Sequence, residues 1–165
     1  MEHKTFWKQG KKAKVKKPKK EPFYPKMKTV HENRSKAVRL LGVVSVVSPE
    51  EAYARCYTCL SLVNIKLMDC GHYIKRGNKS VTFNMKFNLR PQCKFCNDHG
   101  KGEQEKYRAH LIEEMGSGPV AEFELFAKKN KNVVTKIHGY ALRIINEESK
   151  AIINRITKEK GIQKW

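Results

Sequence analysis

The sequence predicts an α+β fold: a small ββα finger stapled by a zinc ion, with flanking helices and a disordered basic arm at the N-terminus. Three observations predict it. Residues 1–30 hold eleven lysines against two glutamates. Residues 81–87 alternate between apolar and polar with the period of a strand. Two Cys-x-x-Cys pairs supply four thiolates for one ion, namely Cys56, Cys59, Cys93 and Cys96.

The basic arm is assigned to residues 1–34. Its lysines repel one another and no apolar period accompanies them, so we expect no packed structure there. Eleven lysines and two glutamates give residues 1–30 a net charge of +9, about half of the +19 of the whole chain. Such a field favours a polyanion, and nucleic acid is the main candidate.

The next part of the chain, residues 35–116, is assigned to the finger. Residues 35–47 are apolar, and the sequence leaves helix and strand open, because β-branched residues favour a strand whereas 36–41 suits a helix. Ser48-Pro49-Glu50-Glu51 has the form of a capping box and predicts a short helix to about Arg55. Strands are expected over 65–74 and 81–89, and a helix that carries Asn97 is expected to begin near Cys93.

Residues 117–165 are assigned to a C-terminal helical extension. Apolar residues recur at helical spacing, which predicts helices over about 120–129 and 134–158. The same spacing predicts a helix over about 103–115, at the end of the finger segment. No apolar run reaches the ~20 residues that a membrane-spanning helix needs, and no signal-peptide core follows the N-terminus. We therefore expect a cytoplasmic protein without a membrane partner.

The four paired cysteines predict a closed zinc site. Four thiolates saturate a tetrahedral ion and leave no position for water, so the site is structural in type. A reducing compartment also fits these cysteines better than a disulfide framework does. The segment between the two pairs is 33 residues long, which is more than a plain zinc ribbon needs.

That segment contains residues suited to phosphodiester hydrolysis. His72, then Asn88, then Asn97 directly after the second pair, follow the order of an HNH, or ββα-metal (His-Me), nuclease finger. His72 is the candidate general base, because a neutral imidazole accepts a proton near pH 7. Asn97 is the candidate ligand of a catalytic Mg²⁺ ion, which favours oxygen ligands and water. Asn88 is expected to brace the hairpin across its backbone.

Other residues complete the predicted site. Asp69 is a second candidate Mg²⁺ ligand, although a carboxylate three residues before His72 need not share its site. Arg76, with Lys75 beside it, can stabilise the charge of the transition state or hold a phosphate. Each assignment has a structural alternative: a zinc ligand or a core histidine at 72, a turn asparagine at 88, and an ordinary helix N-terminal asparagine at 97. Cys70 is expected to be a small buried residue.

At these motifs the chain resembles the lambdoid phage NinG (Rap) recombination proteins. The resemblance covers about residues 50–116 and leaves out the arm and the C-terminal helices. It rests on Cys56-x-x-Cys59, Gly71-His72-Tyr73-Ile74-x-Arg76, Asn88-Leu89-Arg90-Pro91-Gln92-Cys93-x-x-Cys96-Asn97 and Tyr107-Arg108-x-x-Leu111-Ile112. Each Cys-x-x-Cys pair forms a knuckle, a tight turn that offers two thiolates to one metal ion. The order of knuckle, histidine, knuckle and asparagine is also similar to that of the phage resolvase endonuclease VII. Many HNH fingers carry an acidic residue or histidine where this chain has Gly71.

The resemblance implies a structure-specific, Mg²⁺-dependent DNA endonuclease of phage recombination that acts on D-loops or Holliday junctions. A homodimer and contacts with other recombination proteins are further expectations, since cutting both strands of a junction suits a two-fold pair. The alternative function is a non-catalytic zinc-finger DNA-binding protein. A basic RNA-binding zinc protein is less well supported, because the sequence lacks an aromatic-rich stacking surface.

Overall fold

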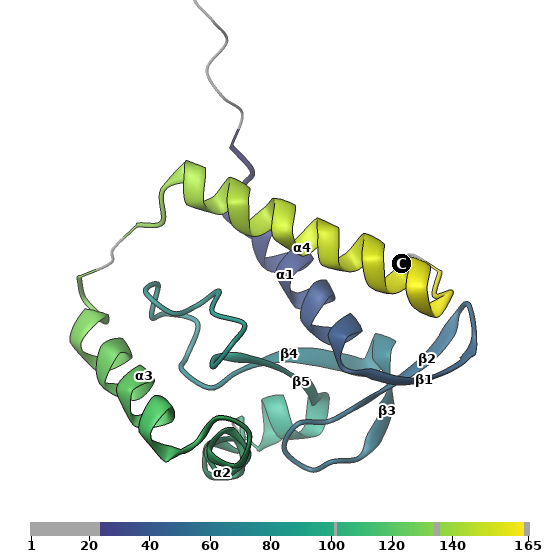
Figure 1. Ribbon diagram of the computed structural model, residues 1–165, viewed down its shortest axis with the longest axis horizontal. Helices are drawn as coiled ribbons and strands as arrows, with labels where there is room; N and C mark the ends of the chain where they lie inside the picture. Colours follow the sequence, from purple (N-terminus) through teal and green to yellow (C-terminus); the bar gives the residue numbers. More distant parts are fainter. Residues whose placement is uncertain (1–23, 101, 134–135, 164–165) are drawn as a thin grey trace, which may run out of the picture.

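The structure is a computed structural model that describes residues 24–100, 102–133 and 136–163. Its helices and strands confirm a mixed α+β architecture (Figure 1). In chain order they are α1 (Met27–Leu41), β1 (Val43–Ser48), β2 (Glu51–Arg55), β3 (Leu62–Asn64), the 3-10 helix η1 (Ile65–Leu67), β4 (Met68–His72), β5 (Leu89–Cys93), the π-helix η2 (Phe95–His99), α2 (Gln104–Met115), α3 (Ser117–Asn130) and α4 (Gly139–Lys160).

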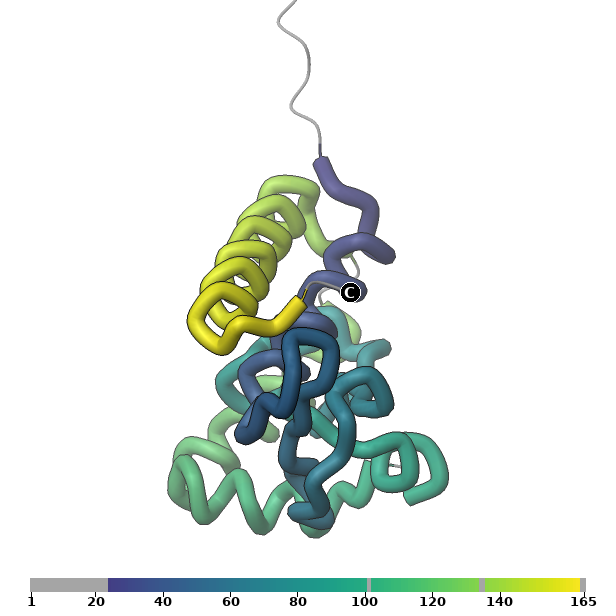
Figure 2. Tube along the Cα trace, turned by 90° about the vertical axis from the view of Figure 1, so that its right-hand side faces the viewer, coloured from purple at the N-terminus to yellow at the C-terminus, as the bar shows by residue number. Residues whose placement is uncertain are grey.

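The elements form layers around a two-stranded ribbon of β4 and β5. The helix α4 lies along α1, and α1 lies on β4 and β5, while α2 and α3 lie on the other side (Figures 1 and 2). The strands β1, β2 and β3 form a separate antiparallel sheet beside the ribbon. The ribbon is antiparallel and pairs Asp69 with Gln92 and His72 with Leu89.

The helix α1 begins inside the segment that the sequence assigned to a disordered arm, so that assignment is wrong from Met27 onward. Residues 1–23 of the arm lie outside the described residues. Buried Val30, Arg34, Ala37 and Val38 recur at helical spacing on one face of α1. Their burial against α4 and the ribbon stabilises a helix that the local charge pattern did not indicate.

The short helix expected after Ser48 is absent from the structure, where residues 48–55 form a β-hairpin with β1. Pro49 and Glu50 occupy the turn between the strands. Ala52 and Ala54 are buried on one side of β2, and β2 pairs with both β1 and β3. Strand pairing on both edges satisfies more backbone groups than one helical turn would, so the capping box is overridden. The same hairpin resolves the ambiguous segment, which is helix as far as Leu41 and strand from Val43.

The strand expected over 81–89 is also wrong in its position: residues 81–87 form turns, and β5 begins at Leu89. Asparagine side chains replace the ladder hydrogen bonds here. Asn84 Oδ1 accepts from the backbone N–H of Phe87 at 2.9 Å, and Asn88 Nδ2 donates to the carbonyl oxygen of Val81 at 3.1 Å. Such local bonds compete with strand pairing. The first predicted strand is shorter than expected, because β4 spans only Met68–His72.

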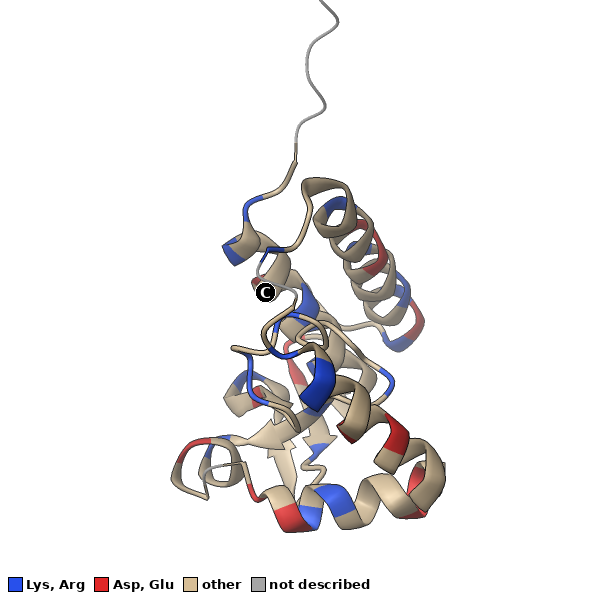
Figure 3. Cartoon of the chain, turned by 90° about the vertical axis from the view of Figure 1, so that its left-hand side faces the viewer, with Lys and Arg blue, Asp and Glu red and all other residues tan. Residues whose placement is uncertain are grey.

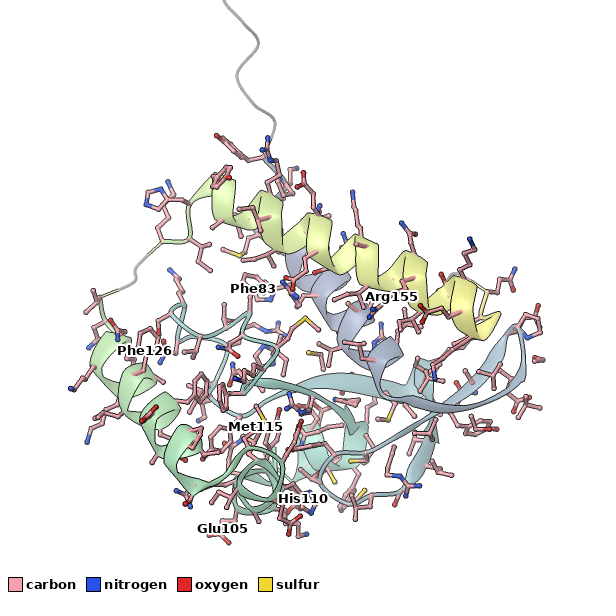
Figure 4. The ribbon with its side chains drawn as sticks, viewed as in Figure 1. Phe83, Glu105, His110, Met115, Phe126 and Arg155 are labelled. Carbon is pink, nitrogen blue, oxygen red and sulfur yellow. The ribbon has the colours of Figure 1, made fainter. Side chains whose placement is uncertain are left out.

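The C-terminal helices agree with the periodicity and take part in the core. In α4, buried Leu142 packs with Val30 of α1 and with Phe83, which lies beneath α4 in Figure 4. Arg34 Nη2 forms an ion pair with Glu148 at 2.6 Å, which also joins α1 to α4. Among the described residues, none of the helices is long and apolar enough to cross a membrane.

Candidate metal centre and active site

The four knuckle cysteines converge where β2 meets β5. Their sulfur atoms all lie within 4.8 Å of one another, and the Sγ atoms of Cys59 and Cys93 are 3.8 Å apart. Tetrahedral zinc with bonds of about 2.3 Å separates its sulfur ligands by roughly 3.8 Å. The cluster, which also contains Cys56 and Cys96, can therefore hold one zinc ion, as the sequence predicted.

Backbone contacts shape this cluster before any metal binds. The N–H of Cys93 donates to Cys56 Sγ at 3.3 Å, and the N–H of Tyr57 donates to the carbonyl oxygen of Pro91 at 2.8 Å. Burial raises the pKa of the Cys56 thiol, but hydrogen bonds from Cys59 and other groups outweigh it and lower the pKa to about 6. The thiolate, which is the form that binds zinc, is thus favoured at one of the four ligands.

The two candidate Mg²⁺ ligands lie together beside the cysteine cluster. Asp69 stands on β4 and Asn97 stands on η2, and Asn97 Nδ2 donates to Asp69 Oδ2 at 3.2 Å. This bond uses one oxygen of Asp69 and no oxygen of Asn97. Asn97 Nδ2 also lies 3.2 Å from Oδ1 of exposed Asp98, a carboxylate that the sequence analysis did not single out although it directly follows Asn97. These oxygens suit Mg²⁺, which favours carboxylate and amide ligands and retains water.

Gly71 has no room for a side chain. A Cβ atom there would lie 1.8 Å from Oε1 and 2.7 Å from Cγ of Gln92. Gln92 is fully buried and donates from Nε2 to the carbonyl oxygen of Gly102 at 3.0 Å. Residues 69 and 71 share a face of β4, because side chains alternate along a strand. Asp69 therefore presents its carboxylate on the face where position 71 offers none.

His72 lies on the other face of β4, toward α1. Burial lowers the pKa of His72 to about 4, with further lowering by the charges of Arg76 and His31, and a hydrogen bond to the carbonyl oxygen of Cys70 opposes this shift. His72 Nδ1 lies 3.2 Å from that oxygen. The ring is neutral at pH 7, so it is present in the form that accepts a proton. The structure thus brings Asp69 and Asn97 together and places His72 across the strand from them.

Asn88 braces the loop between β4 and β5, as the sequence predicted. Its side chain is fully buried and bonds to both backbone groups of Ile74: Oδ1 accepts from the N–H at 2.5 Å, and Nδ2 donates to the carbonyl oxygen at 3.2 Å. Its own carbonyl oxygen accepts from the N–H of Tyr73 at 2.9 Å. These bonds fix the chain directly after His72.

Arg76 is exposed and lines a cleft of about 650 Å³ between this loop and α1. Lys28, His31 and Arg39 of α1 line the same cleft. Burial lowers the pKa of His31, and the charge of Arg76 lowers it further. Lys28 and His31 fall in the segment 1–34 that was predicted to be a disordered arm, and Arg39 falls in the segment 35–47 that was left open between helix and strand. The helical spacing of the buried residues of α1 is the sequence feature that could have predicted this helix, and with it the three cleft residues.

Cys70, Lys75, His99 and His110 lie outside the group of proposed catalytic residues. Cys70 packs with Val38 and Leu89, and burial raises the pKa of its thiol to about 12. Lys75 lines a different cleft from Arg76. The His99 ring lies 6.0 Å from that of Phe95, and His110 Nδ1 lies 2.5 Å from the carbonyl oxygen of Tyr57. His110 thus anchors α2 to the first knuckle, near the position labelled in Figure 4.

Comparison with known families gives a match to the family model described as Bacteriophage Lambda NinG protein, over residues 1–159. The match extends beyond the motif resemblance at residues 50–116 and includes both the basic arm and most of α4. No curated protein and no solved structure matches the chain.

Proposed function

This chain belongs to the NinG family, and from this premise we propose that it is a metal-dependent endonuclease of phage recombination that hydrolyses branched DNA. The observation that carries the proposal is the pairing of Asp69 with Asn97 beside the cysteine cluster, on the ribbon that ends in His72. The two predicted ligand residues come from segments 28 residues apart, and Asn97 Nδ2 lies 3.2 Å from Asp69 Oδ2, which leaves Asn97 Oδ1 and the second oxygen of Asp69 for an ion.

The proposed roles follow from these surroundings. His72, neutral at pH 7, takes a proton from the attacking water. Arg76 contacts the phosphate and stabilises the negative charge that develops there. Asn88 holds the loop between His72 and Arg76 in place through its bonds to Ile74. Because His72 lies across β4 from Asp69 and Asn97, the scissile phosphate would have to sit at the end of the strand, within reach of both faces. A Mg²⁺ ion held by Asp69 and Asn97 would then supply further charge relief at the phosphate and the leaving oxygen. The zinc ion held by the four cysteines would be structural.

The proposed partner is branched DNA, such as a D-loop or a Holliday junction. A homodimer would place two sites on the two strands of a junction. In the structure, part of the apolar side of α4 packs against α1: Ile153 and Ile156 share a core with Leu40. A dimer that used α4 would therefore have to form through its outer side.

The test is single-turnover cleavage of labelled branched, duplex and single-stranded DNA with Mg²⁺, for the wild type and for His72→Ala. We expect cleavage of branched DNA by the wild type and loss of cleavage by the variant. Binding is measured in parallel without a divalent ion. Binding without cleavage under any divalent ion would favour the alternative, a non-catalytic zinc-finger DNA-binding protein.

A further inference from the structure

We propose that a second basic cleft, on the other side of the loop that carries Arg76, binds the phosphodiester backbone of DNA. This lysine cleft has a volume of about 520 Å³ and lies between the loop after β4 and the end of α3. It is lined by Tyr73, Ile74, Lys75, Gly77, Asn78, Glu124, Ala127, Lys128 and Lys131. The proposal rests on the proposed function for the identity of its ligand.

The lysine cleft carries more positive than negative side chains. Lys75, Lys128 and Lys131 are exposed. Glu124 is the carboxylate among the lining residues, and it already accepts a hydrogen bond from Arg108 Nε at 2.8 Å and another from the hydroxyl of Tyr73. The charge of Glu124 is thus paired with Arg108, which adds a further cation beside the three lysines. Figure 3 shows this side of the molecule, with basic segments from several elements near its middle.

A buried hydrogen bond joins the two segments that carry these lysines. Asn78 Nδ2 donates to the carbonyl oxygen of Ala127 at 2.8 Å, which ties the loop of Lys75 to the helix of Lys128. Cations in the last turn of a helix also complement its dipole. That effect explains Lys128, but it does not explain Lys75, which comes from another segment. A preformed cluster of cations from two segments is what a phosphate backbone requires.

The lysine cleft and the proposed active site share one loop. Lys75 lines the lysine cleft, and the next residue, Arg76, lines the cleft beside His31. A DNA backbone that crosses the loop can therefore contact both residues. In this arrangement the lysine cleft holds phosphates that flank the one presented to His72, and it contributes affinity rather than chemistry.

The test compares two triple variants of the full chain with equal loss of charge. The first is Lys75→Gln, Lys128→Gln and Lys131→Gln. The control is Lys66→Gln, Lys150→Gln and Lys158→Gln, which changes exposed lysines of η1 and α4. Duplex and branched DNA binding is measured on zinc-saturated protein, with neither Mg²⁺ nor a chelator added, over a series of salt concentrations. Each lost phosphate contact reduces the slope of log affinity against log salt by about 0.9 on duplex DNA.

We expect the first triple to flatten the slope by roughly 2 to 3 units, and the control to change it much less. Equal slopes in the two triples, or an effect on duplex RNA but not on DNA, would overturn the proposal. A fall in thermal stability with an unchanged slope would also overturn the proposal, because it would show that the lysines contribute to the fold and not to DNA binding. Because no Mg²⁺ is added, cleavage does not interfere with the measurement, and loss of binding by the first triple supports the cleft even if the wild type never cuts DNA. Conversely, cleavage by the wild type does not rescue the cleft if the slope is unchanged.

Discussion

The two faces of the β4–β5 ribbon are packed against different parts of the chain. Asp69 and Gln92 lie on one face, next to η2 and the cysteine cluster. Cys70 and His72 lie on the other face, where Val38 of α1 packs on Cys70 and where burial, together with His31 of α1, lowers the pKa of His72. The first face is polar and is built from residues near the metal ligands in sequence. The second is desolvated by a helix that lies some thirty residues earlier in the chain.

This difference separates two chemical requirements on one short ribbon. Oxygen ligands for a hydrated cation need access to water, and the Asp69–Asn97 pair is only partly buried. A base needs to be neutral, and burial on the α1 side keeps His72 neutral. The two faces should therefore respond differently to substitution.

Cys93→Ser should remove the zinc site and unfold the part of the protein around the cysteine cluster. We call the face of the ribbon with Asp69 and Gln92 the metal face, and the face with Cys70 and His72 the α1 face. Structural zinc contributes apparent folding energies on the order of 10 kcal/mol, which is comparable to the whole stability of a small domain. Metal analysis of the wild type should give about one zinc per chain, with loss of zinc and of cooperative unfolding in the variant. A variant that retains stoichiometric zinc and native stability would contradict the assignment.

His72→Ala should remove chemistry from the α1 face and leave the fold intact. Loss of a general base typically costs ~10²–10⁴ in rate. Single-turnover cleavage measures the effect, with zinc content, melting temperature and DNA binding as controls. Cleavage at the wild-type rate would remove His72 from the mechanism.

Asn97→Ala should act through the divalent ion instead. Loss of one ligand oxygen should weaken Mg²⁺ binding by on the order of tenfold to a hundredfold, by analogy with losses reported for groups around metal sites. Raising the Mg²⁺ concentration should recover part of the cleavage rate for this variant and none for His72→Ala. Identical metal dependence in the wild type and the variant would exclude Asn97 as a ligand.

Gly71→Ala tests how tightly the metal face is packed. The new Cβ would overlap the buried Gln92 side chain, and overpacking typically costs about 1–3 kcal/mol. The matched control is Gly77→Ala, since nothing lies within 4 Å of a Cβ at that position. Denaturant unfolding should show a loss for Gly71→Ala only. Equal stability of the two variants would mean that Gln92 moves aside.

The pH dependence of stability tests the burial of His72. Its folded pKa of about 4 lies below the ordinary 6.5, so between these values the unfolded chain binds a proton that the folded chain does not. Its contribution is therefore complete above pH 6.5 and is lost as the pH falls toward 4, with a slope of up to ~1.4 kcal/mol per pH unit. His72→Gln should flatten this slope in zinc-saturated protein. An unchanged slope would show that His72 is not desolvated.

The sequence by itself determined the local features. The spacing of the four cysteines, the position of Asn97 after the second knuckle and the helical periods of α2, α3 and α4 depend on neighbours in the chain, so the pattern predicted them. The bracing role of Asn88 was also predicted, although the bonds that carry it reach back 14 residues to Ile74 and 7 residues to Val81.

Only the tertiary structure decided the rest. The helix α1 emerged from a lysine-rich segment because α4 and the ribbon bury its apolar face, and residues 48–55 became a hairpin because β1 and β3 both pair with β2. The meeting of Asp69 with Asn97, the packing of Gln92 over Gly71 and the desolvation of His72 all join distant segments. Contacts of this kind depend on which surfaces are buried together, and burial is a property of the folded chain rather than of any local run of residues.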